Sequence, residues 1–400
     1  MDVLTRLQDR GFVQQCTHPD ELGAALGRER ITFYVGFDPT ARSLHVGHLL
    51  QVMLMANLQR AGHKVIALVG GGTSRVGDPS GRTDMRQMLS DEEIADNSAN
   101  FRAQLGRFLV LDGEAGVMVD NADWLMQLQY IPFLRDIGRH FSVNRMLAAE
   151  AYKMRLERGL SFIEFNYQIL QSYDFLELNR RHGCTLQIGG DDQWGNIVAG
   201  VDLVRRIEQR DVFGLTTPLL TTASGAKMGK TAAGAVWLDA SLLAPFDFWQ
   251  YWYNCDDRDV VKLLKLYTFL DDARIAELAA LRGAAIRDAK RVLANELTTL
   301  VHGAEAAREA EAGAAAMVGA SAAEELPTHA LTEPVRLSAA LEAAGLVKSK
   351  SEARRLVAQG GLTIDGVKVD DADALIDPAG AGRVVRLGKK RAVRFVLTST

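Results

Sequence analysis

The stretch from residue 31 to residue 69 constrains the fold more than any other part of the chain. Residues 31–36 (ITFYVG) are mostly β-branched or aromatic and end in glycine, which predicts a buried strand followed by a turn. A helical pattern then covers 45–61, Gly62 ends that helix, and residues 64–69 (KVIALV) predict a second buried strand. A strand, a helix and another strand in this order form a βαβ unit, so the sequence predicts a parallel sheet.

Changes in the apolar periodicity divide the rest of the chain. A further strand pattern at 185–188 extends the predicted sheet, whereas the sequence before it reads mainly as helix. After Pro245 only helical patterns occur, and few large apolar residues lie between Ala304 and Pro327. The predicted fold class is therefore α/β. Residues 1–240 would form a Rossmann-like parallel-sheet nucleotide-binding domain, which contains a helical insertion at about 73–184. An α-helical domain at 245–320, a linker at 320–334 and a small basic α+β domain at 335–400 would follow.

The charge balance excludes a basic field over the whole chain. Lys and Arg number 46 against 50 Asp and Glu, so any nucleic-acid contact has to come from a local patch, and DNA is not expected as a partner. No apolar run reaches the length of a membrane span, and no signal peptide is visible. The three cysteines lie far apart without zinc-ligand spacing, so we expect reduced thiols, no bound metal and a cytoplasmic location.

A local basic patch does occur near the C-terminus. Residues 348–394 contain eleven Lys and Arg against six Asp and Glu. A basic helical pattern with Lys348, Lys350, Arg354 and Arg355 leads into a hairpin pattern with Asp-Gly at its turn. These four side chains are candidate RNA contacts, although charge alone leaves an ordinary solvated surface open as the alternative.

Two histidines stand at the predicted start of the 45–61 helix. His45 and His48 share one face of its first turn, where free N–H groups attract anions, and the nearby Thr40 hydroxyl adds a donor. Gly47 leaves the backbone open to a flat ring such as adenine. The pattern indicates a nucleotide phosphate site, while a metal pair or two capping histidines remain open as alternatives.

A second candidate phosphate contact is the segment Lys227-Met228-Gly229-Lys230-Thr231. Its two lysines are three residues apart in a glycine-bounded loop, which could close over a triphosphate. A solvated turn is the alternative. The segment does not match the GxxxxGK[ST] phosphate-binding loop, because the spacing between its glycines is one residue short and it does not stand between a first strand and helix.

Polar side chains form a stripe on a third predicted helix, within residues 161–178. Tyr167, Gln171 and Asp174 are four and three residues apart and share one helix face among apolar neighbours. Burying such a stripe costs free energy unless a polar ligand meets it, so the pattern indicates a ligand pocket. A stripe that faces water is the alternative.

Together these motifs resemble the signatures of a known enzyme class. HVGH at 45–48 and KMGKT at 227–231 resemble the HIGH and KMSKS signatures of class I aminoacyl-tRNA synthetases, in the same order. Over nearly its whole length the sequence resembles the bacterial tyrosyl-tRNA synthetase family, on YVGFDPT from residue 34, GGGT from 70, GDPSG from 77 and QIGGDDQWGN from 187.

The resemblance implies a role for each matching residue. For L-tyrosine, the phenol hydroxyl would meet Tyr34 and Asp174, the ammonium group Asp78, Tyr167 and Gln171, and the carboxylate region Gln187 and Gln193. The residues that would contact ATP are Gly36, Asp38, Thr40, His45, Gly47, His48, Asp192, Lys227, Met228, Lys230 and Thr231. Five of them would form the catalytic set: Thr40, His45, His48, Lys227 and Lys230. Arg82 and Arg86 match basic positions and are candidate phosphate or tRNA contacts, with ordinary surface charges as the alternative. Val35 stands where relatives often carry cysteine.

The resemblance also implies the reaction and the partners. The family activates L-tyrosine with ATP to tyrosyl-adenylate and pyrophosphate, and then transfers tyrosine to the 3′ end of its tRNA. L-tyrosine, ATP and tyrosine tRNA are thus the expected partners, with Mg²⁺ accompanying ATP and no tightly bound cofactor. A homodimer with an interface near Phe162 is implied as well. The helical domain at 245–320 would contact the anticodon arm of the tRNA, and the basic domain at 335–400 would bind RNA. Two alternatives stay open: a tryptophanyl-type synthetase, and a catalytically idle RNA-binding relative that keeps the fold.

Overall fold

The computed structural model describes most of the 400-residue chain, namely residues 2–80, 89–157, 159–223, 225, 228–231, 234–323, 328–331, 333–365, 367–377, 382–387 and 391–397. At residues 151, 154, 230, 231, 316–323, 391, 392 and 397 it describes the backbone alone. The chain divides into two compact units, Met1–Ala314 and Ala315–Thr400, and each is described by itself.

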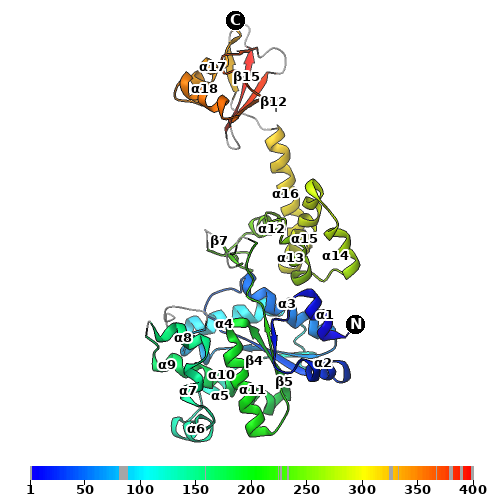
Figure 1. The fold of residues 1–400 in the computed structure, drawn as a ribbon, viewed down its shortest axis with the longest axis vertical. Helices are drawn as coiled ribbons and strands as arrows, with labels where there is room; N and C mark the ends of the chain where they lie inside the picture. The colour runs from blue at the N-terminus through cyan, green and yellow to red at the C-terminus, as the bar shows by residue number, and fades with distance from the viewer. Residues whose placement is uncertain are drawn as a thin grey trace. The chain divides into compact units, whose positions relative to one another are not determined.

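A parallel sheet forms the centre of the first unit (Figure 1). Within the described residues its six strands lie in the order β1 (Gln15–Cys16), β6 (Phe213–Thr217), β5 (Cys184–Gly190), β2 (Thr32–Phe37), β3 (Lys64–Val69) and β4 (Gly116–Asp120). Neighbouring strands are parallel except β1, which runs antiparallel to β6. The predicted βαβ unit consists of β2, α3 (Val46–Arg60) and β3, which confirms the predicted fold class.

Alternating side chains along β2 contribute to two separate cores, one on each face of the sheet. Phe33, Val35 and Phe37 join the core that includes α3, whereas Tyr34 joins the other. The first core contains side chains of α1 (Val3–Arg10), α2 (Pro19–Arg28), α3 and α4 (Asp91–Leu105). The second contains side chains of α5 (Ala122–Leu125), α6 (Tyr130–Asp136), α7 (Val143–Leu147), α8 (Glu150–Leu156), α9 (Phe162–Phe165), α10 (Tyr167–His182) and α11 (Trp194–Glu208).

Strand β4 lies inside the stretch that the sequence predicts as a helical insertion. Its residues pair with β3 in parallel register, from Val65 with Gly116 to Val69 with Asp120. The strand is only five residues long and begins with glycine, so its periodicity is too short to separate it from the helices around it. The stretch therefore extends the sheet as well as adding helices.

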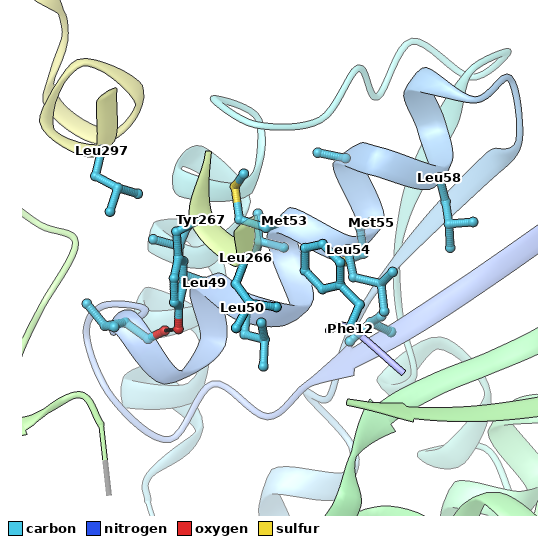
Figure 2. Packing of buried hydrophobic residues seen from close by; sticks show 14 of the residues in the cluster. Phe12, Leu49, Leu50, Met53, Leu54, Met55, Leu58, Leu266, Tyr267 and Leu297 are labelled. Atoms are coloured by element: carbon cyan, nitrogen blue, oxygen red, sulfur yellow. Dashed lines mark hydrogen bonds between the residues drawn. The ribbon is translucent and has the colours of Figure 1, made fainter. Parts of the chain in front are cut away.

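Helices α12 to α16 follow the sheet, and α13 contacts both α3 and α1. They span Pro245–Tyr253 (α12), Val260–Tyr267 (α13), Asp272–Ala279 (α14), Ile286–His302 (α15) and Ala304–Ala323 (α16). Figure 2 shows Leu266 and Tyr267 of α13 packed beside Leu49, Leu50 and Met53 of α3. Among the described residues, no helix combines the length and the apolar character that crossing a bilayer requires.

The second unit has its own apolar core and its own sheet. Within its described residues, five strands lie in the order β12 (Val367–Lys368), β11 (Leu362–Ile364), β14 (Arg383–Leu387), β15 (Arg391–Leu397) and β9 (Thr328–Leu331), and β10 (Val335–Arg336) pairs with β13 (Leu375–Ile376). Helices α17 (Leu337–Ala343) and α18 (Lys350–Ala358) contribute apolar side chains to this core. The hairpin of β11 and β12 turns at Asp365, which has a left-handed φ of 48°.

We expect Leu58→Ala to destabilise the first unit strongly. Leu58 of α3 is 0% exposed, and removing a buried leucine side chain costs about 2–5 kcal/mol of unfolding free energy. Val110→Ala serves as the control, because Val110 is 55% exposed. Denaturant unfolding followed by circular dichroism measures both variants, and equal losses of stability would contradict the packing described here.

Candidate functional site

The two histidines predicted at a helix start lie together at the N-terminus of α3. His45 is the N-cap, and its Nδ1 accepts a hydrogen bond from the Gly47 N–H at 3.0 Å. The His48 Nδ1 accepts from the His45 N–H at 3.2 Å, and the two rings stack with centroids 3.9 Å apart. Because each Nδ1 acts as an acceptor, each neutral ring carries its proton on Nε2, where it can donate to an anion. Capping and anion binding are therefore compatible.

Glycine at position 47 is required by the His45 ring. A Cβ at this position would lie 2.8 Å from His45 Cε1 and 3.0 Å from Nδ1. The sequence predicts that Gly47 makes room for a nucleotide ring, and the structure adds a steric reason within the protein itself. Thr40 follows β2 in the loop that leads to α3, where its N–H donates to the Asp38 carbonyl at 2.7 Å.

The segment that carries the lysine motif returns to the same helix start. The Val46 N–H donates to the Val236 carbonyl and the Leu238 N–H to the Leu44 carbonyl, each at 2.9 Å. Met228 is half-buried, and Lys230 and Thr231 form the short strand β7 (Lys230–Thr231), which pairs with β8 (Gly234–Ala235). Lys227, Arg82 and Arg86 lie outside the described residues.

Tyr34 and Asp174 form the buried polar end of the site. Both are 2% exposed, Tyr34 on β2 and Asp174 on α10. The Tyr34 hydroxyl has no hydrogen-bond partner within the described part of the chain. Burial first, and then the nearby Asp174 charge, raise the pKa of Tyr34. A buried hydroxyl without a partner is costly, so this position favours a ligand with a polar group of its own.

Asp174 is held by two donors that the sequence did not indicate. The Asn121 Nδ2 donates to one carboxylate oxygen at 2.9 Å and the Trp124 Nε1 to the other at 2.8 Å. Burial nevertheless raises the pKa of Asp174 to about 8, against the lowering effect of both donors and with a further increase from Asp38 and Asp120. This carboxyl group is therefore poised between its neutral and charged forms near neutral pH.

A hydrogen-bond chain joins Asp174 to Asp38. The Asn121 Nδ2 also donates to the Thr73 hydroxyl at 3.0 Å, and that hydroxyl donates to Asp38 at 2.8 Å. The Tyr167 hydroxyl donates to the other Asp38 oxygen at 2.9 Å. Asp38, predicted for ATP, thus contacts Tyr167, predicted for tyrosine, so the two predicted ends of the site meet at this carboxylate.

A second polar cluster surrounds Asp78. The Gln193 Nε2 donates to the Asp78 carboxylate at 2.7 Å, and the Asn196 Nδ2 donates to Gln171 Oε1 at 3.0 Å and Gln193 Oε1 at 3.1 Å. Asn196 ends the QIGGDDQWGN motif, but the sequence did not indicate a role for it. The stripe of Tyr167, Gln171 and Asp174 therefore faces other polar side chains, and the alternative of a stripe in water does not apply.

The remaining predicted positions lie on β2, β5 and the turn after β5. Gly36 is the exposed residue of β2, and Asp192 lies in η3 (Asp191–Gln193) directly after β5. Gln187 of β5 is buried, and its Oε1 has no hydrogen-bond partner among the described residues. A Cβ at Gly200 would approach that oxygen to 2.8 Å, so glycine there leaves space for the amide.

A metal site requires several of the side chains that commonly bind metals to lie together. In the part of the chain that the structure describes, no group of three or more His, Cys, Asp or Glu side chains has the arrangement of a metal site. Cys16, Cys184 and Cys255 are free thiols.

Known proteins are similar to this chain in both sequence and fold. Residues 26–319 match the family model of class I tRNA synthetases (W and Y), and residues 335–379 match the S4 domain. The tyrosine–tRNA ligase of Clostridium kluyveri is 51% identical over 403 residues, which covers 99% of each chain. That of Acetivibrio thermocellus is 51% identical over 398 residues, or 97% of each chain.

Solved structures agree with these sequence matches. A C-terminally truncated mitochondrial tyrosyl-tRNA synthetase of Aspergillus nidulans matches with a TM-score of 0.72 and 30% identity, over 79% of this chain and 94% of that chain. A tryptophanyl-tRNA synthetase of Encephalitozoon cuniculi bound to tryptophan matches with a TM-score of 0.58 and 13% identity, over 76% and 87% of the respective chains. The second match shows a shared fold alone.

We expect Asp174→Asn to change how stability depends on pH. With a pKa of about 8 against an ordinary value of 3.8, folded Asp174 keeps a proton that the unfolded chain releases. The stabilisation from this proton is complete below pH 3.8 and is lost as pH rises towards about 8. Without substrates, the melting temperature of the unaltered protein should therefore fall relative to that of Asp174→Asn between these limits. Parallel pH profiles would contradict the raised pKa.

Proposed function

The chain belongs to the tyrosine–tRNA ligase family of class I tRNA synthetases, and on this premise we propose a role for each end of its buried site. The activity of this chain is that of a tyrosine–tRNA ligase, which activates L-tyrosine with ATP and transfers it to tRNA. The unpartnered Tyr34 hydroxyl beside Asp174 is the observation that carries the proposal for the pocket.

The phenol hydroxyl of L-tyrosine would bind between Tyr34 and Asp174. A phenol both donates and accepts, so it can give its proton to the carboxylate while it accepts from the Tyr34 hydroxyl. Phenylalanine would leave both buried groups without this partner, which costs free energy. Selectivity would thus come from polar groups that only a hydroxyl-bearing ring satisfies.

The amino-acid group of the substrate would face the second polar cluster. Asp78, Tyr167 and Gln171 offer oxygen atoms for the ammonium group, and the Asp78 and Tyr167 oxygens already lie in hydrogen-bonded positions. Gln187 and Gln193 would lie near the substrate carboxylate. The unpartnered Oε1 of Gln187 supports a polar ligand in this region.

ATP would bind across the carboxyl end of the sheet and the start of α3. Asp192 would accept a hydrogen bond from the ribose. The nucleoside would lie against Gly36, Asp38, Gly47 and His48. The phosphates would contact Thr40, His45, Lys227 and Lys230, with Met228 and Thr231 beside them. The N–H groups of the helix start and the Nε2–H donors of the histidines favour anions there. Mg²⁺ would accompany ATP, and we propose no tightly bound cofactor. Arg82 and Arg86 are proposed as further phosphate or tRNA contacts.

The proposed chemistry needs no protein nucleophile. The tyrosine carboxylate attacks the α-phosphorus of ATP, the bond to the bridging oxygen breaks, and pyrophosphate leaves with the electron pair. Donors at the start of α3 and the two lysines stabilise the charge that moves onto pyrophosphate. The 3′-terminal ribose hydroxyl of tRNA then attacks the tyrosyl carbonyl, and AMP leaves.

The second unit is proposed to bind tRNA. Lys348, Lys350, Arg354 and Arg355 all lie at or near α18 with exposed side chains, where they can reach phosphates. Arg354 also pairs with Asp373 at 3.0 Å, which reduces the charge that it can offer. The S4 match over residues 335–379 supports an RNA-binding role for this unit.

The proposed location is the cytoplasm, where translation takes place. The alternatives from the sequence are less favoured. Tryptophan would satisfy only part of the Tyr34 and Asp174 pair, because an indole N–H can donate to the carboxyl group but cannot accept from the Tyr34 hydroxyl. A catalytically idle RNA-binding relative needs neither the Tyr34 and Asp174 pair nor the two histidines that cap α3.

ATP–pyrophosphate exchange tests the proposed pocket. Tyrosine should support exchange, whereas phenylalanine and tryptophan should not. Tyr34→Phe removes one hydrogen bond and should raise the KM for tyrosine about 2- to 12-fold, from about 0.5–1.5 kcal/mol, and Asp174→Ala should disrupt tyrosine recognition further. Tyr173→Phe is the control, because the Tyr173 ring packs against Phe133, with ring centroids 5.4 Å apart, whereas the Tyr34 ring packs against Phe175. Tryptophan-dependent exchange, or untouched selectivity in Asp174→Ala, would overturn the assignment.

A homodimer is the second proposal that the surface supports. Large apolar side chains are exposed on helices α6 and α9 of the first unit: Phe162 at 69%, Ile131 at 69% and Tyr130 at 59%. Large exposed apolar side chains are typical of protein contact surfaces where they lie together. A second copy of the chain is the proposed occupant.

Phe162→Asp should therefore convert the dimer into a monomer, because it places a charge on this apolar surface. Size-exclusion chromatography with light scattering measures the mass. Leu375→Asp is the matched control, since Leu375 is 70% exposed on the second unit. An unchanged elution volume for Phe162→Asp would exclude this interface.

A further inference from the structure

The lysine loop, which we define as residues 220–236, is tied to α3 through its own backbone. The Met228 N–H donates to the Leu220 carbonyl and the Val236 N–H to the Gly229 carbonyl, each at 2.9 Å. Val236 in turn accepts from the Val46 N–H at the start of α3. The loop is thus a hairpin whose returning strand joins the helix start that carries His45 and His48.

Gly229 brings the loop into direct contact with that helix start. A Cβ at Gly229 would lie 3.2 Å from the Gly47 nitrogen, and the residue has a left-handed φ of 84°. Any side chain at this position would therefore be strained and crowded. The close approach fixes the backbone between the two motif lysines against the first turn of α3.

The other side of the loop is held by helices α12 and α13. The Gly229 N–H donates to the Tyr251 hydroxyl of α12 at 3.3 Å. The Ala223 N–H donates to the carboxylate of Asp259, directly before α13, at 2.8 Å. Lys262 of α13 donates to the Thr221 carbonyl at 3.1 Å.

A cavity lies where these contacts are made. Its volume is about 730 Å³, and its lining includes Met228 and Val236 of the loop together with Tyr251 and Asp259. Three side-chain hydrogen bonds, to or from Tyr251, Asp259 and Lys262, therefore attach the loop to these helices beside the cavity.

Helix α13 also contacts the start of α3 directly. The Tyr267 hydroxyl donates to the buried Val46 carbonyl at 3.1 Å. One helical layer thus touches both parts of the phosphate site, α3 through Tyr267 and the lysine loop through Asp259.

We propose that Tyr251 and Asp259 are positioning residues for tyrosyl-adenylate formation, which hold the lysine loop against the first turn of α3. The inference rests on the proposed role of that loop. Neither residue belongs to the tyrosine pocket. They act through the Gly229 and Ala223 N–H groups, which set the path of the backbone that carries Lys227 and Lys230.

The test is ATP–pyrophosphate exchange with the full-length protein. Tyr251→Phe removes the acceptor for Gly229, and Asp259→Ala removes that for Ala223. Each should lower kcat about fivefold, the equivalent of one hydrogen bond of about 1 kcal/mol, with the KM for tyrosine unchanged. Asp259→Asn keeps an oxygen that can accept from Ala223 and should restore kcat.

Tyr253→Phe is the matched control on the same helix, because the Tyr253 ring stacks on Trp249, outside the loop contacts. Melting temperatures show whether each variant folds. The proposal is overturned if Tyr251→Phe and Asp259→Ala match Tyr253→Phe in kcat, if Asp259→Asn is as slow as Asp259→Ala, or if their kcat falls only together with folding. Absence of tyrosine-dependent exchange in the unaltered protein would instead overturn the proposed function.

Discussion

The parallel pairing of β2 with β3 and β5 is the constraint on which the whole site depends. Parallel strands end at a common edge, so the segments that follow them meet there. Asp38 follows β2, Thr73 follows β3, Asn121 follows β4 and Asp192 follows β5. The strand alternation then decides the face: Tyr34 points to the core that includes α10, and Val35 points to the core that includes α3. The polar pocket thus follows from the parallel pairing of the strands and from the face of the sheet on which each side chain lies.

The buried carboxyl of Asp174 shows how this site differs from an ordinary core. Burying a charge is costly, and the two donors from Asn121 and Trp124 only partly offset that cost, because the pKa remains raised to about 8. In the proposed pocket, the substrate hydroxyl would add a third donor and so favour the charged form. Binding of the substrate and ionisation of Asp174 would therefore be coupled. Recognition of the ring would depend on buried polar groups whose hydrogen bonds the fold alone does not complete.

The sequence predicted those parts of the structure whose signal is local. The segments 31–36 and 64–69 are apolar because β2 and β3 are buried on both faces, and the stripe from Tyr167 to Asp174 follows from helical spacing alone. Asn121 and Trp124 were missed because β4 is too short to recognise, so nothing marked the residues after it as part of the sheet edge. The loop contacts of Tyr251 and Asp259 join residues that are distant along the chain, and only the tertiary fold brings them together.

The two ends of the site are built in different ways, and in the proposed function one end takes tyrosine and the other the phosphates of ATP. The tyrosine end is formed by β2, α10 and the turn after β4, all within one buried core, so its geometry is set once the sheet has folded. The phosphate end is formed by the start of α3 together with a loop that rests on α12 and α13 across a cavity. Its geometry depends on helices that do not contribute to the tyrosine pocket. If Tyr251 and Asp259 hold the lysine loop as proposed, a contact that shifts α12 or α13 would alter the rate of activation before it altered the selection of the amino acid, because Tyr34 and Asp174 lie on β2 and α10.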